Sequence, residues 1–393
     1  MKKLLIIGAS ILQLPAIQKA KELGYYVGVI DYNPNAIGVP LADEYFNVST
    51  IDIEGVAETA VKFKPDGIMT LATDMPMRSI ARAAERCALP GITMDSAIKS
   101  TDKGEMIRTF EAHGVEHPWF YIAENEEAFN EVKEKVTFPC IMKPTDNSGS
   151  RGVVLCHSLE ELEKEYAYTK NESRGGGVIS EDFMQGSEVS VEVMVTDGTP
   201  HILQVTDKLT TGAPHFVEMG HSQPCRLGDT AVSQIRDLAS RAVLSVGIKN
   251  GPAHVEIMYT ANGPKMVELG ARMGGGCITT HLVPLSTGID MTRATMDVAC
   301  GERPDLTPTL QCGSAIRFFN AELGVISSID GVEEAMKIEG VREISFTKNV
   351  GDAVVPLHSG ADRIGFVIAQ AETAEKAVEI CEKALATVKI NVQ

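Results

Sequence analysis

The chain has 393 residues, more than one ordinary domain holds, so two or three domains are expected. Hydrophobic residues make up 44% and charged residues 23%, a balance typical of a globular protein and not of a disordered one. With 36 basic and 53 acidic side chains the net charge is −17, which opposes binding to nucleic acid or to anionic membranes. A local cationic pocket for a small anion is compatible with that charge.

The eight cysteines are scattered, without a CxxC pair or metal-ligand spacing. This pattern is typical of buried thiols in a reducing compartment. The first apolar run stops at Gly8, too short for a secretion signal, and no run approaches the ~20 apolar residues of a membrane span. We therefore expect a cytoplasmic protein without disulfides or zinc.

Strands and helices alternate through the first hundred residues. Apolar runs predict strands at 4–7, 27–30 and 67–71, and helical periodicity follows at 12–23, 54–64 and 76–87. This alternation predicts right-handed βαβ units and an open parallel sheet. Asp31 ends the second strand, as in dinucleotide sites, but Gly8-Ala9-Ser10 lacks the later glycines of GxGxxG, so we predict a scaffold without NAD.

The rest of the chain divides into two patterns. Residues 97–114 are predicted as helical, with Ser100, Thr101 and Asp102 offering caps. Helices follow at 125–134 and 158–170, and strands at 138–143, 152–156 and 177–183. The glycine-rich stretch 173–177 is interpreted as a flexible connection. After 186 the pattern becomes antiparallel, with strands at 188–195, 201–205, 253–259 and 265–269 and helices at 229–247, 332–337 and 374–387.

A strand that ends in a lysine comes before a loop rich in glycine and serine. Lys143 ends the strand, and backbone N–H groups of the loop 145–152 can fold over phosphate oxygens. A lysine there presents a point charge to the same phosphates. The loop residues assigned to phosphate are Ser148, Gly149, Ser150, Arg151 and Gly152.

An apolar strand then runs into the acidic hinge 181–184. Glu181 can accept a hydrogen bond from an adenine amino group, and Phe183 and Met184 lie in the same hinge, where Met184 can offer backbone groups to the ring. Glu188 on the next strand can bond both ribose hydroxyls. The alternative is a surface acidic turn.

The most specific feature is a hairpin whose turn is centred on Asn262. That turn makes Glu256 face Glu268, and both carboxylates project from one side because side chains alternate along a strand. Opposed carboxylates suit Mg²⁺, which also takes phosphate oxygens, and Arg272 beyond them can act as a phosphate or carboxylate fork. The alternative, two exposed acids on an edge hairpin, fits the apolar surroundings less well.

A polar stretch at 216–224 is interpreted as a loop. Glu218 and His221 in it can face the ammonium and carboxylate groups of an amino-acid-like substrate. Gly274 and Gly275 come later, in a glycine run beyond the hairpin.

Taken in order, these features resemble an ATP-grasp ligase over most of the chain. Lys103 and Lys143 resemble the two phosphate-binding lysines of that family, and Glu256 and Glu268 match its magnesium ligands. The stretch 267–275, together with 216–221, is most similar to the L-amino-acid (dipeptide) ligases. One departure is Gly270, which stands where the family has an asparagine ligand.

The resemblance implies an α/β and α+β fold: a Rossmann-like domain at 1–100, a linking helix and small lobe at 101–186, and a large lobe with the C-terminal region at 187–393. Nucleotide would lie between the two lobes, as ATP with two Mg²⁺ or Mn²⁺ ions. A carboxylate would become an acylphosphate and then react with an amine. Lys143 and Arg272 would be catalytic, and Glu218, His221, Arg272, Gly274 and Gly275 would bind substrate. A homodimer is compatible with the family.

Three other functions are considered, and the sequence argues against each to a different degree. An ATP-grasp enzyme for a purine precursor or bicarbonate is disfavoured mildly by the 216–224 stretch. A nucleotide-binding regulatory module predicts lost charged positions, yet the two lysines and the two metal carboxylates are all present. An NAD-dependent oxidoreductase needs the glycines that the first turn lacks.

Overall fold

A four-stranded parallel sheet in the order β3-β2-β1-β4 forms the N-terminal region of the computed structural model, which describes residues 1–147, 151–213 and 216–393. The strands are β1 (Lys3–Ile7), β2 (Tyr26–Ile30), β3 (Glu44–Phe46) and β4 (Gly67–Met69), and the helices are α1 (Leu14–Glu22), α2 (Ile53–Phe63) and α3 (Met77–Cys87). The predicted parallel sheet is confirmed. Asp31 accepts hydrogen bonds from the backbone N–H groups of Ala9 (2.8 Å) and Asn33 (2.9 Å), so its carboxylate stabilises the first turn.

The single helix predicted at 97–114 is wrong, because the chain breaks there into α4 (Met94–Lys99) and α5 (Lys103–Ala112). The side chain of Asp102 caps α5 by accepting hydrogen bonds from the N–H groups of Gly104 (2.9 Å) and Glu105 (3.0 Å). An aspartate in this position competes with helix continuation and favours a new N-terminus. As a result, Lys103 is the first residue of α5.

A small antiparallel sheet in the order β5-β8-β6-β7 follows. Its elements are β5 (Phe120–Ala123), α6 (Glu126–Lys135), β6 (Cys140–Pro144), β7 (Val154–Cys156), α7 (Leu159–Glu172) and β8 (Val178–Asp182). The helices meet where Phe129 stacks on Tyr166 with ring centroids 3.6 Å apart. The connection at 173–177, predicted to be flexible, is anchored by the Asp146 carboxylate, which accepts from the N–H groups of Arg174 (3.0 Å) and Gly175 (2.7 Å).

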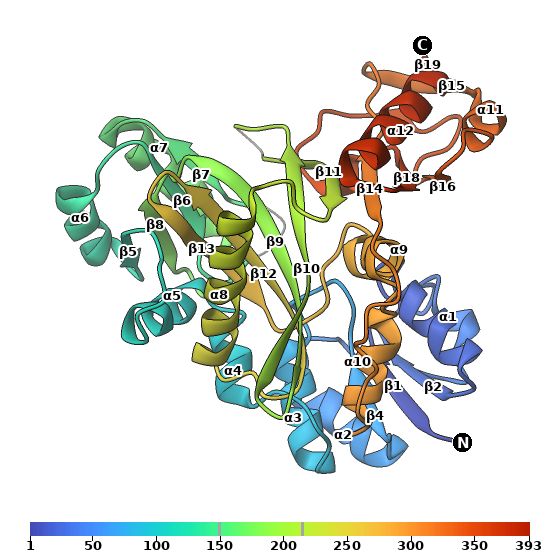
Figure 1. Ribbon diagram of the computed structural model, residues 1–393. Coiled ribbons are helices and arrows are strands. Elements are labelled where there is room, and N and C mark those ends of the chain that lie inside the picture. The colour runs from blue at the N-terminus through green and yellow to red at the C-terminus, as the bar shows by residue number, and fades with distance from the viewer. Residues whose placement is uncertain (148–150, 214–215) are drawn as a thin grey trace.

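The central sheet has eight strands in the order β13-β12-β9-β10-β11-β14-β18-β16 (Figure 1). Their bounds are β9 (Gly186–Thr196), β10 (Thr199–Thr210), β11 (Glu218–Gln223), β12 (Gly251–Thr260), β13 (Gly263–Gly270), β14 (Gly313–Phe318), β16 (Val341–Phe346) and β18 (Gly365–Ala371). The loop predicted at 216–224 is wrong over β11, which pairs antiparallel with β10 and β14. The glycine and polar residues of β11 gave no strand pattern, and the strand forms because it pairs with a neighbour on each side.

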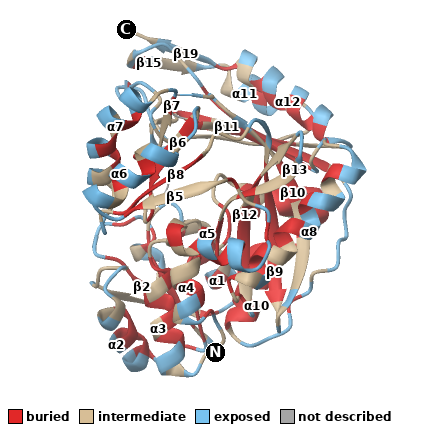
Figure 2. Cartoon of the chain, turned by 90° about the vertical axis from the view of Figure 1, so that its left-hand side faces the viewer, coloured by how far each residue is buried: buried red, intermediate tan, exposed pale blue. Residues whose placement is uncertain are grey.

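The two faces of this sheet differ in chemistry. Val189, Val191 and Val193 of β9 pack in one core with residues of α8 (Asp229–Ser245). The side chains between them point to the other face, because a strand alternates with period 2, and there β9 carries Glu188, Ser190 and Glu192. In Figure 2 buried residues concentrate in the central strands, and exposed ones lie on the outer faces of the helices.

The C-terminal third of the chain connects distant parts of the fold. Helix α10 (Met291–Ala299) returns to the N-terminal region and packs against α1 and β4, whereas α9 (Val283–Thr287) lies near β10 and β14. Helix α12 (Ala374–Thr387) covers β14 and β18, and α11 (Val332–Met336) adjoins it beside a small sheet of β15 (Gly324–Asp330), β17 (Ala353–Val354) and β19 (Lys389–Val392). None of the helices in the described ranges is long and apolar enough to cross a membrane.

The cap of α5 yields a stability prediction. Replacing Asp102 with alanine removes both capping bonds and is expected to cost about 0.5–2 kcal/mol of stability. Asp52→Ala is the matched control, because Asp52 caps α2 through a single bond to the N–H group of Gly55 (3.0 Å). Thermal unfolding should show Asp102→Ala at least as destabilised as Asp52→Ala. An unchanged midpoint for Asp102→Ala contradicts the role of the cap.

Candidate functional site

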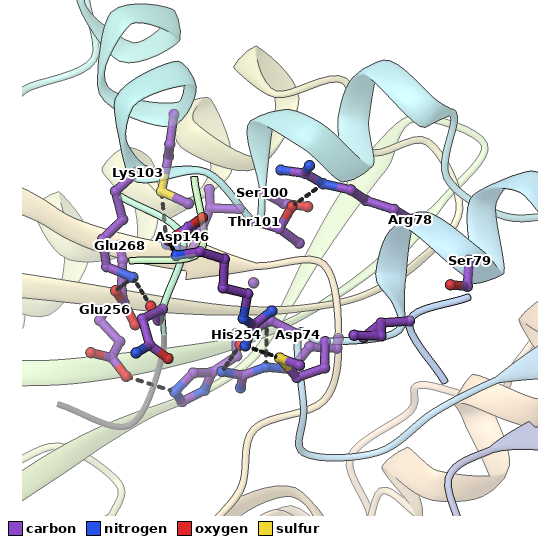
Figure 3. Close-up of a pocket in the computed structure, with 18 of the residues that line it drawn as sticks. Asp74, Arg78, Ser79, Ser100, Thr101, Lys103, Asp146, His254, Glu256 and Glu268 are labelled. Atoms are coloured by element: carbon purple, nitrogen blue, oxygen red, sulfur yellow. Dashed lines mark hydrogen bonds and ion pairs between the residues drawn. The ribbon is translucent and has the colours of Figure 1, made fainter. Parts of the chain in front are cut away.

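A cavity of about 260 Å³ lies where the N-terminal region, the β12–β13 hairpin and the loop after β6 meet (Figure 3). Asp74 and Arg78 line it from the N-terminal region, Lys103 from the start of α5, and Glu256 and Glu268 from the hairpin. Charged groups of both signs therefore converge on one space from parts of the chain far apart in sequence.

The predicted pairing across the hairpin is confirmed, since Glu256 and Glu268 occupy opposed positions on β12 and β13. Like charges so placed repel each other unless cations compensate them. Glu268 lies 2.9 Å from the Lys103 ammonium, and Glu256 lies 3.1 Å from that of Lys208. Two lysines thus hold the opposed carboxylates at the cavity wall.

Lys208 of β10 is the first of several site residues that sequence reasoning missed. Its ammonium is almost fully buried and lies 2.6 Å from Glu188, 3.1 Å from Glu256 and 3.3 Å from Glu218. Burial lowers the pKa of Lys208, but the three carboxylates, Glu256 first, raise that pKa well above its ordinary value. Nothing local in the sequence marks Lys208, because β10 mixes apolar and polar residues and Lys208 belongs to no motif.

The three carboxylates respond differently to this lysine. Burial raises the pKa of Glu188, and the nearby Glu256 carboxylate adds to that rise despite Lys208. Burial also raises the pKa of Glu256 and of Glu218, but cations outweigh it in both cases. Lys208 and His254 together lower the pKa of Glu256, and Lys208, His221 and Arg363 together lower that of Glu218. Lys208 and His254 therefore favour the charged form of Glu256.

A buried histidine supports Glu256 from the opposite side. His254 contacts Glu192 at 2.8 Å and Glu256 at 3.3 Å, so one imidazole bridges two carboxylates. Burial lowers the pKa of His254, but Glu192 and Glu256 raise it overall to about 9. Gly274 packs directly on this ring, because a Cβ atom there would lie 2.6 Å from Nδ1 of His254. Sequence reasoning had assigned Gly274 to the substrate, and it had given neither Glu192 nor His254 a role.

Arg272 forms a two-pronged ion pair with Asp74. Its Nε and Nη2 donate to the two carboxylate oxygens of Asp74, each at 3.0 Å, which links the hairpin to the N-terminal region. A Cβ atom at position 270 would lie 2.3 Å from Oδ1 of Asp74. Gly270 has no side chain where the family has an asparagine, and the Asp74 carboxylate occupies the volume that a side chain would need.

Of the residues predicted to bind nucleotide, Lys143 and Glu181 lie on the small sheet, whereas Lys103 begins α5 and Glu188 lies on the central sheet. Lys143 of β6 lies 2.6 Å from Glu181 of β8, and both are buried. Lys103 also donates to the carbonyl oxygen of Asn147 (2.8 Å), which joins the loop after β6 to Glu268. Phe183 and Met184 lie between β8 and β9, and Glu188 is near the start of β9.

The predicted phosphate loop is described in part. Arg151 and Gly152 lie just before β7, whereas Ser148, Gly149 and Ser150 fall outside the described residues. Gly152 adopts φ +74°, a left-handed conformation that favours glycine, and its carbonyl accepts a hydrogen bond from Thr169 at 3.0 Å.

Glu218 and His221, predicted as loop residues, lie on strand β11 instead. His221 is fully buried, and its Nε2 lies 3.7 Å from Oε2 of Glu218. Neither ring nitrogen makes a hydrogen bond to another described residue. Glu218 lies close to Lys208, so Glu218 and His221 belong to the same charge network. Gly275 lies near Ala72 of the N-terminal region.

The donor set of the hairpin fits a hard divalent cation. Glu256 and Glu268 are opposed carboxylates that line a cavity, and Mg²⁺ is commonly bound by one or two carboxylates together with substrate phosphates. Across residues 1–147, 151–213 and 216–393, no group of three or more histidine, cysteine, aspartate or glutamate side chains is arranged to hold a metal. The protein thus offers a partial coordination shell, which phosphate oxygens can complete.

Comparison with known proteins agrees with this fold. Residues 136–281 match an ATP-grasp domain model, and residues 317–393 match a model named L-amino acid ligase C-terminal domain 2. The chain therefore contains an ATP-grasp domain, and its C-terminal region is similar to a domain of L-amino acid ligases.

Individual relatives span more than one reaction type. Alanine–anticapsin ligase of Bacillus subtilis is 26% identical over 76% of this chain and 67% of its own length. Formate-dependent phosphoribosylglycinamide formyltransferase of Ignicoccus hospitalis is 25% identical over 99% of this chain and 96% of its own. The crystal structure of an L-amino acid ligase from Bacillus licheniformis shares the fold, with a TM-score of 0.86 and 23% identity over 100% of this chain and 99% of that one.

The close contact at Gly274 yields a prediction with an adjacent control. A side chain in Gly274→Ala collides with His254 and Glu192 and should cost about 1–3 kcal/mol of stability. In Gly275→Ala the new atom would lie 3.6 Å from Ala72, an ordinary contact. Thermal unfolding should therefore separate the two variants clearly. Equal midpoints contradict the packing of Gly274 on the imidazole.

The bridging histidine predicts a pH dependence of stability. Folded His254 keeps its proton up to about pH 9, whereas the unfolded residue keeps it only up to 6.5. The stabilisation, on the order of 3 kcal/mol, is thus complete below pH 6.5 and is lost as the pH rises through about 9.

Thermal unfolding of nucleotide-free protein in EDTA at pH 6.5 and pH 9.5 measures this loss. The margin of wild type over His254→Gln should shrink at the higher pH. A margin that stays constant or grows would show that His254 is not charged in the folded protein.

Proposed function

We propose that the chain is an ATP-dependent ligase that joins a small carboxylate to an amine, with formation of ADP and phosphate. The observation that carries this proposal is the opposed pair of Glu256 and Glu268, which two lysines hold beside a cavity that Arg272 also lines. The family match supports ATP as the phosphate donor. The match to an L-amino acid ligase C-terminal domain supports an amino acid as the carboxylate.

The described residues offer groups for each part of the nucleotide. Lys103 and Lys143 are the cations available to its phosphates, and the segment 181–184 between β8 and β9 is available to its base. Lys143 and Glu181 now neutralise each other, so nucleotide binding must supply new partners for at least one of them. When bound, Mg²⁺ would be held by Glu256 and Glu268 and would offset the charge of the phosphates.

The first step requires positioning more than covalent chemistry. A carboxylate oxygen attacks the γ-phosphorus, the bond to the ADP oxygen breaks, and an acylphosphate forms. Lys103 and Arg272 lie where they can stabilise negative charge along this path, because both line the cavity. Burial lowers the pKa of Arg272, but Asp74 raises it overall, so the guanidinium stays charged.

In the second step the amine attacks the carbonyl carbon of the acylphosphate. The carbon–oxygen bond to phosphate breaks, phosphate leaves with the electron pair, and the amine releases a proton to that phosphate or to water. Glu218 and His221 are proposed to contact the amino-acid substrate, and Gly275 to leave room for it. No nucleophilic side chain of the protein is required.

A second candidate has support from one comparison. The relative from Ignicoccus hospitalis matches almost the whole chain and is named formate-dependent phosphoribosylglycinamide formyltransferase. Formate is also a small carboxylate, so the first step would be the same. The C-terminal domain match favours the amino-acid ligase, and the choice of carboxylate decides between them.

The metal carboxylate gives the sharpest test. Glu268→Gln keeps the shape of the side chain but removes its charge, so ADP formation should fall about 100-fold or more. Glu116→Gln is the control, since Glu116 is half exposed and pairs with Arg241 near β13.

The assay measures phosphate release with ATP, Mg²⁺ and pairs of amino acids, with mass spectrometry of the product and with formate and bicarbonate as rival carboxylates. The Glu116 variant should keep wild-type turnover. Full turnover in Glu268→Gln removes the metal assignment, and turnover with formate alone supports the second candidate.

A further inference from the structure

The cavity has a second end, which the proposed chemistry leaves unused. Figure 3 shows Arg78 and Ser79 on one side and Lys103, Glu256 and Glu268 on the other. Ser100 and Thr101 also line this second end. It is built by the start of α3 and by the break between α4 and α5.

Arg78 in the cavity wall has no carboxylate partner among the described residues, whereas Arg174 interacts with the Asp146 carboxylate. Arg78 uses its Nε to donate to the hydroxyl of Thr101 at 3.0 Å, which fixes the guanidinium at the wall. Arg174 contacts the sulfur of Met75 through Nη2 at 2.6 Å. The nearby acids are already engaged, since Asp74 pairs with Arg272 and Asp146 accepts from backbone N–H groups. This end of the cavity therefore carries uncompensated positive charge in a chain whose net charge is −17.

A buried hydroxyl at the same place lacks a partner. Ser79 is 1% exposed, lines the cavity, and its Oγ makes no hydrogen bond to any described residue. A buried polar atom without a partner destabilises the folded protein. Ser79 is also in the first turn of α3, where free backbone N–H groups and the helix dipole favour an anion. A ligand with acceptor oxygens in this end of the cavity would give the Ser79 hydroxyl a partner and would offset the charge of Arg78.

We propose that this end of the cavity binds an anionic group of a substrate, a carboxylate or a phosphate, that does not itself react. The inference rests on the proposed ligase function, because the reacting carboxylate must lie at the other end, beside Glu256 and Glu268. Arg78 supplies the charge, Thr101 fixes its guanidinium, and the Ser79 hydroxyl donates a hydrogen bond. The selected substrate class is a carboxylate or amine that carries a second, distal anion.

Binding measurements test this inference without turnover. Calorimetry in the presence of Mg²⁺ and a non-hydrolysable ATP analogue compares L-glutamate with L-glutamine, O-phospho-L-serine with L-serine, and L-alanine with L-alaninamide. The first pair reports a side-chain carboxylate, the second a phosphate, and the third the carboxylate of an amino-acid acceptor. At least one anionic member should bind about 10- to 100-fold more tightly than its neutral partner.

Variants on one helix assign that preference to the site. Arg78→Gln should remove the preference, and Ser79→Ala should weaken it while leaving thermal stability equal or higher, because an unpartnered hydroxyl is lost. Arg82→Gln is the matched control, since Arg82 lies one turn further along α3 and pairs with Glu54 (2.9 Å) and Glu85 (3.1 Å) at the surface. It should keep the wild-type preference.

The outcomes separate this inference from the proposed function. A preference that is present in wild type and lost in Arg78→Gln supports the site, even if no amino-acid pair yields ADP and the ligase proposal fails. No preference in any pair, or one that survives in Arg78→Gln, overturns the site, even if neutral amino acids are ligated.

Discussion

The structure depends on one arrangement of charge: acidic side chains gathered on a single face of the central sheet and held there by buried cations. Glu268, Glu256 and Glu188 lie on the neighbouring strands β13, β12 and β9, and Lys208 follows on β10. The opposite face is apolar and packs on α8. Because a strand alternates with period 2, a shift of one residue in register would bury these charges against α8, so the apolar face also fixes the site.

Lys208 makes this arrangement compatible with folding. Carboxylates this close repel each other, and a buried charge needs a partner. The lysine contacts three of them, and His254 links a fourth, Glu192, to Glu256. The protein thus carries its own counter-charges in the absence of ligand. Nucleotide and metal would then enter a site that is already shaped, which lowers the cost of organising it on binding.

Much of the site could be predicted from the sequence, because short motifs mark many of its residues. The pairing of Glu256 with Glu268 was predicted from a turn centred on Asn262, and the pairing is correct, but a bulge between Glu256 and Ile257 produces it. The strand that carries Lys143 was predicted from its apolar run and spans Cys140–Pro144. The helix break before Lys103 was not predicted, although Ser100, Thr101 and Asp102 were recognised as candidate caps, and Asp102 is the one that caps α5. The strand β11 was also missed, because its stability comes from pairing with β10 and β14 and not from its own residues.

Other parts of the site depend on contacts between segments distant in sequence. Asp74 and Arg272 are 198 positions apart, and nothing local to either predicts their ion pair. The same contact explains Gly270, which the sequence shows only as a missing asparagine. Lys208 likewise can contact its three carboxylates only when β9, β10, β11 and β12 are side by side. Sequence reasoning identified ligand-like residues and missed the residues that hold them in place.

The central claim is that the opposed carboxylates bind divalent metal together with a nucleotide. Electron paramagnetic resonance of Mn²⁺ measures this directly, in titrations with and without a non-hydrolysable ATP analogue. The account predicts tight Mn²⁺ binding only when the nucleotide is present, weakened about 10-fold or more by either Glu256→Gln or Glu268→Gln. Nucleotide-dependent Mn²⁺ binding that is unchanged in both variants would contradict it.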